Sequence, residues 1–224
     1  MAIFLDSTKL EEIKKYKDMG IIRGVTTNPT MLLKEGVKGE ARIKKHMIKI
    51  AKLVSPMPVS VGVDTNDPKE MIRQAKAIAS WSKNINVKIS IHGPNGELDN
   101  LMVVQELEKK DNIRVNVTAM MSAQQCFLAA MAGASFVSIL AGRVNNMGYD
   151  AAGEIKTLRS LLDQHQLKSQ IIAASTREGL NVLHWLSAGA HIVTVLPQLL
   201  DGMIVHPYSK ETVRMFLDDA AKNR

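Results

Sequence analysis

The chain has 224 residues, of which 46% are hydrophobic and 23% charged, and its formal net charge is +7. This composition is typical of a globular domain, and no apolar run approaches the roughly 18 residues that a membrane-spanning helix needs. A single cysteine, Cys126, excludes an internal disulfide and any multi-cysteine metal site, and its apolar helical neighbours indicate a buried side chain.

The positive net charge is compatible with either a nucleic-acid partner or an anionic substrate. The basic residues, however, are spread through helical segments that also carry acidic residues, and the chain has only three Tyr, four Phe and two Trp. Because platforms for base stacking are scarce, we expect no nucleic-acid partner. The N-terminal residues lack the basic and apolar regions of a signal peptide, which predicts a cytoplasmic protein with no membrane partner.

Short β-branched runs alternate with longer amphipathic stretches along the whole chain. The runs predict strands at 3–5, 22–26, 59–63, 85–89, 113–117, 136–139, 171–174 and 192–195. The first helix is expected to begin after Ser7 or Thr8 and to stop at Gly20. The second is expected to end near residue 52, with a possible break near Gly36 or Gly39. Later helices are predicted to begin at 67–68 and to span 123–132, 151–165 and about 209–222.

Eight nearly continuous hydrophobic strands, each followed by a helical stretch, favour a parallel sheet. We therefore predict the α/β class and a single (β/α)8 TIM barrel over residues 1–224, with an extra C-terminal helix at about 209–222. A doubly wound open sheet is the alternative.

Lys88 is the residue of greatest interest, because it lies in the middle of the predicted fourth strand. Strand side chains alternate between two faces, so Lys88 shares its face with Asn86 and Ser90. Two interpretations are open. Lys88 can be a solvated edge residue, or burial can lower its pKa so that the neutral amine attacks a carbonyl.

In a barrel of this kind, the chemistry lies at the carboxyl ends of the strands. Several polar and charged side chains follow the predicted strands at that edge. They are Asp6, Thr27, Asn28, Gly62 with Asp64, Lys88, Ser90, Thr118, Ser138, Arg143, Ser175 and Arg177. Core packing does not require these residue types, so they favour the catalytic interpretation of Lys88.

Six motifs together resemble the transaldolase family, in particular its short-subunit branch with the fructose-6-phosphate aldolases. The motifs are Asp6, Gly24-Val25-Thr26-Thr27-Asn28-Pro29-Thr30, Val87-Lys88-Ile89, Asn116-Val117-Thr118, Gly142-Arg143 and Ala173-Ala174-Ser175-Thr176-Arg177. The resemblance extends from Ile3 to the C-terminal helix. The Thr-Thr-Asn-Pro turn and the Val-Lys-Ile strand are specific in combination, whereas either alone is a weak signal.

The resemblance implies a covalent mechanism at Lys88, which matches the family's Schiff-base lysine. Cleavage of the ketose C3–C4 bond would leave a three-carbon enamine on this lysine, and Asp6 matches the acid/base that exchanges the C4-hydroxyl proton. Asn28 matches the residue that binds the dihydroxyacetone part, and Thr118 the one that holds the catalytic water. A neutral lysine is needed to form the iminium, and burial would lower the pKa of Lys88.

The resemblance also implies an anionic sugar substrate. Arg143, Ser175 and Arg177 match the group that binds its terminal phosphate, since two guanidiniums offer bidentate hydrogen bonds to a tetrahedral anion. The simpler alternative is that both arginines pair with loop carboxylates. Four further residues are assigned to substrate binding, namely Ser138, Thr27, Ser60 and Ser90. No cofactor is implied, and the histidines lack the spacing of a metal site.

The chain departs from the family pattern at three places, one of which puts Leu140 where the family often has an aromatic side chain near the donor site. Where the third strand of transaldolases has a glutamate that activates water, and the aldolases have glutamine, this chain has Gly62. Asp64, two residues on, is expected to point to the same face and is our candidate for the missing catalytic carboxylate, although it could instead cap the next helix. The segment after Lys88, residues 90–97, also differs, and His92 can either enter the pocket or lie on the surface.

Because of these departures, we consider three hypotheses for the function. We favour a transaldolase that moves dihydroxyacetone from fructose 6-phosphate, sedoheptulose 7-phosphate or 6-deoxy-6-sulfofructose to an aldehyde such as glyceraldehyde 3-phosphate. An aldolase that releases dihydroxyacetone and a non-catalytic sugar-phosphate-binding barrel are the alternatives. The family resemblance further implies a homo-oligomer, from dimer to decamer. The C-terminal helix around Val213, Phe216 and Leu217 can contact a neighbour or close its own barrel.

Overall fold

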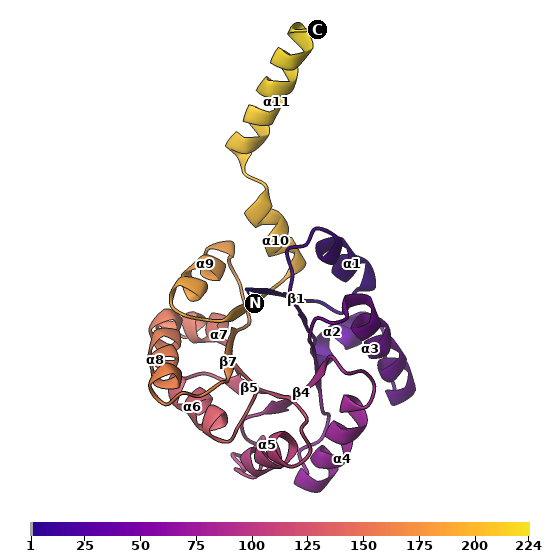
Figure 1. Cartoon of the computed structure of the whole chain (residues 1–224), viewed down its shortest axis with the longest axis vertical. Coiled ribbons are helices and arrows are strands. Elements are labelled where there is room, and N and C mark those ends of the chain that lie inside the picture. Colours follow the sequence, from indigo (N-terminus) through magenta and orange to yellow (C-terminus); the bar gives the residue numbers. More distant parts are fainter. Residues whose placement is uncertain (1) are drawn as a thin grey trace.

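A computed structural model describes residues 2–224. Within these residues, eight parallel strands close into a barrel in sequence order, surrounded by helices (Figure 1). The strands are β1 (Ile3–Asp6), β2 (Val25–Thr26), β3 (Val59–Gly62), β4 (Ile85–Ser90), β5 (Val115–Met120), β6 (Phe136–Ile139), β7 (Gln170–Ala173) and β8 (Ile192–Val195). The predicted (β/α)8 barrel is confirmed, and the open-sheet alternative is wrong because β1 pairs with β8.

The helices follow the strands in alternation. They are α1 (Leu10–Asp18), α2 (Pro29–Lys34), α3 (Glu40–Val54), α4 (Pro68–Ala79), α5 (Asn100–Lys109), α6 (Ala123–Met131), α7 (Ala141–Asn146), α8 (Ala151–Gln164), α9 (Gly179–Ser187), α10 (Pro197–Ile204) and α11 (Pro207–Lys222). None of the helices described in residues 2–224 has the length and apolar character needed to cross a bilayer.

Local sequence signals account for several helix ends. The break between α2 and α3 falls where predicted, because Gly36 and Gly39 adopt φ values of +69° and +83° that favour glycine. At the start of α4, the Asp67 carboxylate accepts a hydrogen bond from the Glu70 N–H at 2.8 Å. The predicted boundaries of the second strand were wrong, since β2 contains only two residues. Just before it, a side chain on Gly24 would lie 2.6 Å from the Phe4 ring.

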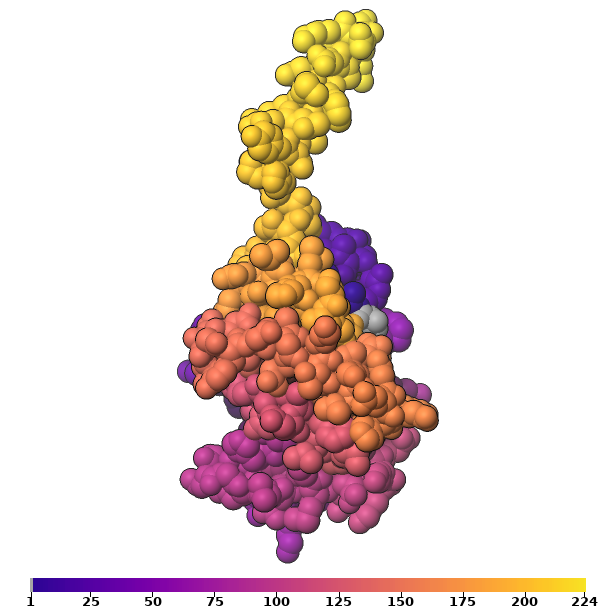
Figure 2. Space-filling view, turned by 90° about the vertical axis from the view of Figure 1, so that its left-hand side faces the viewer, coloured from indigo at the N-terminus to yellow at the C-terminus, as the bar shows by residue number. Residues whose placement is uncertain are grey.

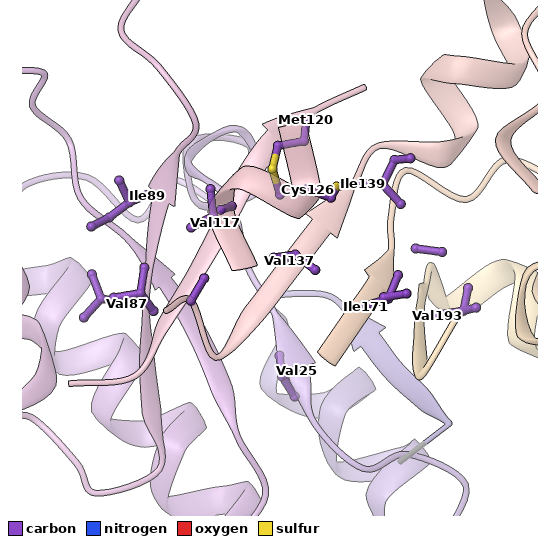
Figure 3. Close-up of a cluster of buried hydrophobic side chains, with 14 of the residues drawn as sticks. Val25, Val87, Ile89, Val117, Met120, Cys126, Val137, Ile139, Ile171 and Val193 are labelled. Atoms are coloured by element: carbon purple, nitrogen blue, oxygen red, sulfur yellow. The ribbon is translucent and has the colours of Figure 1, made fainter. Parts of the chain in front are cut away.

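The main core lies between the barrel wall and the helices. The outward-facing side chains of the strands, such as Val87, Ile89 and Val117, are fully buried there (Figure 3). Each such side chain contributes about 1.5–3 kcal/mol through the hydrophobic effect. Cys126 belongs to this core, as predicted, and burial raises the pKa of its thiol.

The barrel interior has an apolar half and a polar half. Phe4, Phe136, Ile172 and Ile192 form a separate buried cluster on the inward face of four strands. Asp6, Ser138 and Thr194 come two residues after Phe4, Phe136 and Ile192, so they lie on the same inward face but nearer the carboxyl ends. The apolar half therefore closes the barrel below, and the polar half forms the floor of the site above it.

The C-terminal helix leaves the barrel. A hydrogen bond of 2.8 Å from the Tyr16 hydroxyl to the Pro197 carbonyl and an ion pair between Lys15 and Asp201 hold α10 against α1. Beyond α10 the chain extends outward, and α11 projects away from the ring of helices with every side chain exposed (Figures 1 and 2). The predicted helix is therefore confirmed, and it does not close its own barrel.

Candidate active site

Lys88 and Asp6 lie at the carboxyl ends of β4 and β1. The Lys88 ammonium is 3.3 Å from the Thr27 carbonyl oxygen, to which it donates. Burial lowers the pKa of Lys88, and the negative charge of Asp6 opposes this shift. The amine is thus biased towards its neutral, nucleophilic form, as a class I aldol reaction requires.

The pKa of the Asp6 carboxyl is shifted in the opposite direction. Burial raises its pKa, while the hydrogen bond from the Thr26 hydroxyl at 2.8 Å and the positive charge of Lys88 act to lower it. A lysine with a lowered pKa and a carboxyl with a raised pKa are shifted towards each other. Shifts in these directions suit a pair that exchanges protons with a substrate.

Three polar side chains form a chain of hydrogen bonds across the barrel interior. The Asn116 side-chain amide donates to the Ser60 hydroxyl at 3.0 Å, and the Ser138 hydroxyl donates to the Asn116 amide oxygen at 2.7 Å. All three are at most 2% exposed. Asn86 is equally buried, and its amide has no hydrogen-bond partner within the described part of the chain. Their burial places these residues in the barrel interior rather than at the exposed rim.

The neighbouring residues Thr26 and Thr27, at the turn after β2, direct their side chains to different partners, which the sequence did not predict. Thr26 faces the interior, whereas the Thr27 hydroxyl donates to the Ser60 carbonyl at 2.8 Å and approaches the Met47 sulfur of α3. Thr27 was predicted to bind substrate, and its contact with Lys88 is made by its carbonyl oxygen. Its role in substrate binding stays a prediction. Asn28 caps α2 by accepting from the Met31 N–H at 3.0 Å, which leaves its NH2 group as the part that can meet a ligand.

Thr118 and Ser90 are paired in register at the ends of β5 and β4. Thr118 is followed by Ala119 with φ +62°, inside a β-bulge between β5 and β6. Bulges redirect neighbouring side chains and are frequent beside active sites. Ser90 accepts a hydrogen bond of 2.9 Å at its carbonyl from Asn100. His92 is exposed, so the surface interpretation of this residue is confirmed.

Asp64 does not occupy the position that we predicted. Its carboxylate accepts from the Gln74 amide of α4 at 2.5 Å, and its own N–H donates back to Gln74 at 3.0 Å. The prediction assumed that strand alternation continues to Asp64, but β3 ends at Gly62. Asp64 is also not the cap of α4, because Asp67 has that role. It is therefore not placed to replace the family's glutamate.

The two arginines reach the rim from adjacent segments, α7 and the loop after β7. The Gly142 N–H donates to the Ala174 carbonyl at 3.2 Å, and a side chain on Gly142 would lie 1.8 Å from the Ser175 carbonyl oxygen. Glycine is thus required for this close approach, which brings Arg143 beside the segment with Ser175 and Arg177. Ser175 has φ +63°, a conformation that non-glycine residues adopt at a cost of about 1–3 kcal/mol.

Both arginines are exposed, and no ion pair of either appears among residues 2–224. The alternative that they merely pair with loop carboxylates is therefore wrong. The described residues also contain no group of three or more His, Cys, Asp and Glu side chains placed to hold a metal ion.

A cavity of about 390 Å³ lies outside the barrel wall, beside β3 and between α3 and α4. Its lining is largely apolar and includes Ile43, Val61, Ile78 and Trp81, with Asp64 and Gln74 at one end. Thr27, Asn28 and Gly62 also line it, whereas Lys88 and Asp6 do not, so the cavity reaches the edge of the candidate site from outside the barrel. At Gly62, the nearest atom to an added Cβ would be the Lys88 carbonyl oxygen at 4.0 Å, which leaves open space where the family's glutamate would stand.

Sequence reasoning missed two residues of this centre, Thr26 and Thr194. Thr26 was noted only as part of the family motif, and Thr194 was treated as an ordinary strand residue. Alternation within 192–195 offered a signal, since it places Thr194 on the same face as Ile192 and opposite Val193 and Val195. A hydroxyl on the interior face of an apolar strand is a candidate for hydrogen bonding within the site.

Comparisons with known proteins agree with this geometry. The sequence model of the Transaldolase/Fructose-6-phosphate aldolase family matches residues 3–223. A protein named "Probable transaldolase" from Carboxydothermus hydrogenoformans is 38% identical over 219 residues, covering 98% of this chain and 97% of the relative. One with the same name from Exiguobacterium sibiricum is 37% identical over 222 residues, covering 99% of each chain.

Solved structures support the fold alone. A monomeric dihydrodipicolinate synthase variant superposes with a TM-score of 0.62 at 13% identity, covering 87% of this chain and 68% of that chain. A mandelate oxidase gives a TM-score of 0.56 at 13% identity, covering 88% and 65%. The family match over almost the whole chain and the full-length relatives establish more, namely that this chain belongs to the transaldolase/fructose-6-phosphate aldolase family.

Proposed function

We propose that this protein is a class I transaldolase in which Lys88 forms a Schiff base with an anionic ketose. The observation that carries this proposal is that Lys88 and Asp6 are buried together at the carboxyl ends of two strands. This burial lowers the pKa of Lys88 and raises the pKa of Asp6. The neutral Lys88 amine attacks the ketone, and the resulting iminium withdraws electrons from the C3–C4 bond. Asp6 accepts the C4-hydroxyl proton as this bond breaks, and an aldehyde leaves.

The remaining residues are assigned by their position around this pair. The Asn28 NH2 group binds the dihydroxyacetone part, and Thr118 holds the water that is released when the Schiff base forms. Arg143, Ser175 and Arg177 bind the terminal anion, for which two exposed guanidiniums at the rim are suited. The anion is a phosphate or a sulfonate, because both present tetrahedral oxygens to the same donors.

Borohydride trapping tests the covalent step. The protein is incubated with fructose 6-phosphate or 6-deoxy-6-sulfofructose, reduced, and analysed by peptide mass spectrometry. We expect a three-carbon adduct on Lys88, and the ketose that gives more adduct at equal concentration identifies the preferred anion. If neither ketose nor sedoheptulose 7-phosphate leaves any adduct, the barrel is a binding protein and the proposal is wrong.

A second candidate function is an aldolase that releases dihydroxyacetone, and Gly62 bears on the choice between the two. A position without a side chain holds no group that activates or excludes water, so the fate of the enamine depends on the acceptor. We predict that free dihydroxyacetone accumulates slowly from fructose 6-phosphate alone and that added glyceraldehyde 3-phosphate diverts the three-carbon unit into a new ketose. Equal release of dihydroxyacetone with and without this acceptor would identify the protein as an aldolase.

We also propose that the protein is a homo-oligomer in which α11 packs on a second copy. The helix is about 24 Å long from its 16 residues, and isolated helices of this length are marginal in water. Val213, Phe216 and Leu217 are 55–65% exposed, and they recur at the helical spacing of one face. The apolar cavity between α3 and α4 offers a surface of matching character for them.

Light scattering tests this assembly. Phe216→Asp is expected to reduce the molar mass to that of a single chain, because it places a charge on the apolar face of α11. Met215→Asp introduces the same side chain on the opposite face of the helix, where Met215 is 52% exposed, and should leave the assembly intact. A wild-type protein that is monomeric at all concentrations, or equal dissociation of both variants, would contradict the proposed role of this face.

A further inference from the structure

Two buried threonines connect β8 to the Asp6 carboxyl. The Thr194 and Thr26 hydroxyl oxygens are 2.5 Å apart, and the Thr26 hydroxyl lies 2.8 Å from an Asp6 carboxylate oxygen. Both threonines are 3% exposed. In register, Thr26 pairs with Asp6 and Thr194 pairs with Phe4, so the two hydroxyls reach the interior from the strands on either side of β1.

The number of protons fixes the direction of this chain. A threonine hydroxyl has one proton, and an ionised carboxylate only accepts. When Asp6 is ionised, Thr26 must donate to it, so the proton between the two threonines must come from Thr194. When Asp6 is protonated, its carboxyl can donate to the Thr26 hydroxyl, and the Thr26 hydroxyl can then donate its own proton to the Thr194 oxygen. The Thr194 proton would then need another acceptor, and residues 2–224 show none for it.

The backbone of Thr194 is also held in place. Its carbonyl accepts a hydrogen bond of 2.7 Å from the buried Thr176 hydroxyl, in the segment between Ser175 and Arg177. The backbone that carries the Thr194 side chain is therefore fixed beside β1, with its hydroxyl 2.5 Å from that of Thr26. Each donation strengthens the next one along a chain of hydrogen bonds in a low-dielectric interior.

We propose that Thr194 is a positioning residue, whose hydroxyl orients Thr26 to donate to Asp6 and so keeps the Asp6 carboxylate ready to accept the substrate proton. This inference rests on the proposed function of Asp6. Lys88 is the charged group that acts on Asp6 across the barrel. The other titratable groups near this strand end, Glu12, Glu35 and His46, bond to Ser7 or Thr8 instead.

The inference makes a specific prediction about pH dependence. Without the Thr194 hydroxyl, the ionised form of Asp6 loses stabilisation relative to the protonated form, so the acidic limb of the kcat profile moves to higher pH. Thr194→Val should lower kcat on this limb by about two- to tenfold, the equivalent of one hydrogen bond. On the alkaline plateau kcat should be unchanged, because Asp6 is ionised there in both proteins.

Three further variants separate positioning from a structural effect. Thr194→Ser and Thr194→Ala both lose the methyl group and differ only in the hydroxyl. The serine variant should keep the wild-type profile and the alanine variant should show the shift, even if the valine variant fails to fold. Ser169→Ala removes another buried hydroxyl, bonded to the Ala134 carbonyl at 2.6 Å, and should lower stability without moving the limb.

The readouts distinguish this inference from the proposed function itself. Borohydride trapping at alkaline pH should label Lys88 in the Thr194 variants as in the wild type. If the wild type is labelled and all Thr194 variants share its acidic limb, the positioning role is wrong and the proposed function stands. If the wild type itself gives no adduct, the proposed function has failed, and the positioning role fails with it.

Discussion

Lys88→Met is expected to abolish both turnover and borohydride-dependent adduct formation, because Lys88 is the buried amine on which Asp6 acts. Methionine has a similar length and no charge, so it can fill the same space without leaving a cavity. The variant should also unfold at a higher temperature, since burial is the larger of the two effects on Lys88 and the substitution removes a charge that is costly to bury.

The sign of this stability change depends on pH. A lysine whose pKa is lower in the folded state binds fewer protons there, so its charge opposes folding at any pH below its unfolded value of about 10.4. The opposition is full below the folded pKa and fades as pH rises to the unfolded value. The stability gained by Lys88→Met should therefore be largest below the folded pKa of Lys88 and should vanish as pH rises past about 10.4. The gain is reduced by the lost attraction to Asp6, and each kcal/mol regained should raise the melting temperature by about 2–4 °C.

An exposed lysine provides the control. Lys83 is exposed in the loop before β4. Lys83→Met should therefore leave turnover, adduct formation and melting temperature close to wild-type values. Differential scanning calorimetry at neutral pH and at about pH 10.4 measures the stability difference. Residual turnover of the Lys88 variant at a wild-type rate would show that another group carries the covalent step.

The barrel was predictable because each of its strands carries its own signal. Parallel strands buried on both faces read as short apolar runs, and the turns between them contain the glycines, prolines and capping residues that the backbone requires. The carboxyl ends of the strands all lie at one edge of the barrel. The sequence therefore predicted that Lys88 and Asp6 lie near each other. The resemblance to a family added their roles, which composition and periodicity alone do not contain.

The side-chain directions that the sequence could not predict have a shared physical cause. Alternation predicts side-chain direction only while the strand lasts, and β2 and β3 end before Thr27 and Asp64. Once the chain enters a loop, its direction is set by tertiary contacts such as those of Thr27 with Ser60 and Asp64 with Gln74. The placement of α11 was undetermined for a related reason. An amphipathic pattern shows that a helix has an apolar face but does not show which surface covers it.

Asp6→Asn is expected to stop the reaction after the Schiff base has formed. Asparagine has the same shape and can still accept the Thr26 hydrogen bond, but it cannot take the C4-hydroxyl proton. We expect kcat to fall by about 10²- to 10⁴-fold, the usual contribution of general acid–base catalysis. The adduct that borohydride traps from fructose 6-phosphate should then retain all six carbons, whereas the wild type should yield the three-carbon adduct.

The pH dependence of Lys88 gives an independent measurement on the same variant. The negative charge of Asp6 raises the pKa of Lys88 against the effect of burial, so its removal should lower that pKa further. Labelling of Lys88 by an amine-specific reagent should therefore extend to lower pH in Asp6→Asn than in the wild type. Asp163→Asn, which removes an exposed carboxylate paired with Arg159 on α8, should change neither the adduct nor the labelling. A three-carbon adduct formed by Asp6→Asn at the wild-type rate would show that Asp6 is not the base, and the proton acceptor would then have to be sought among the other groups around Lys88.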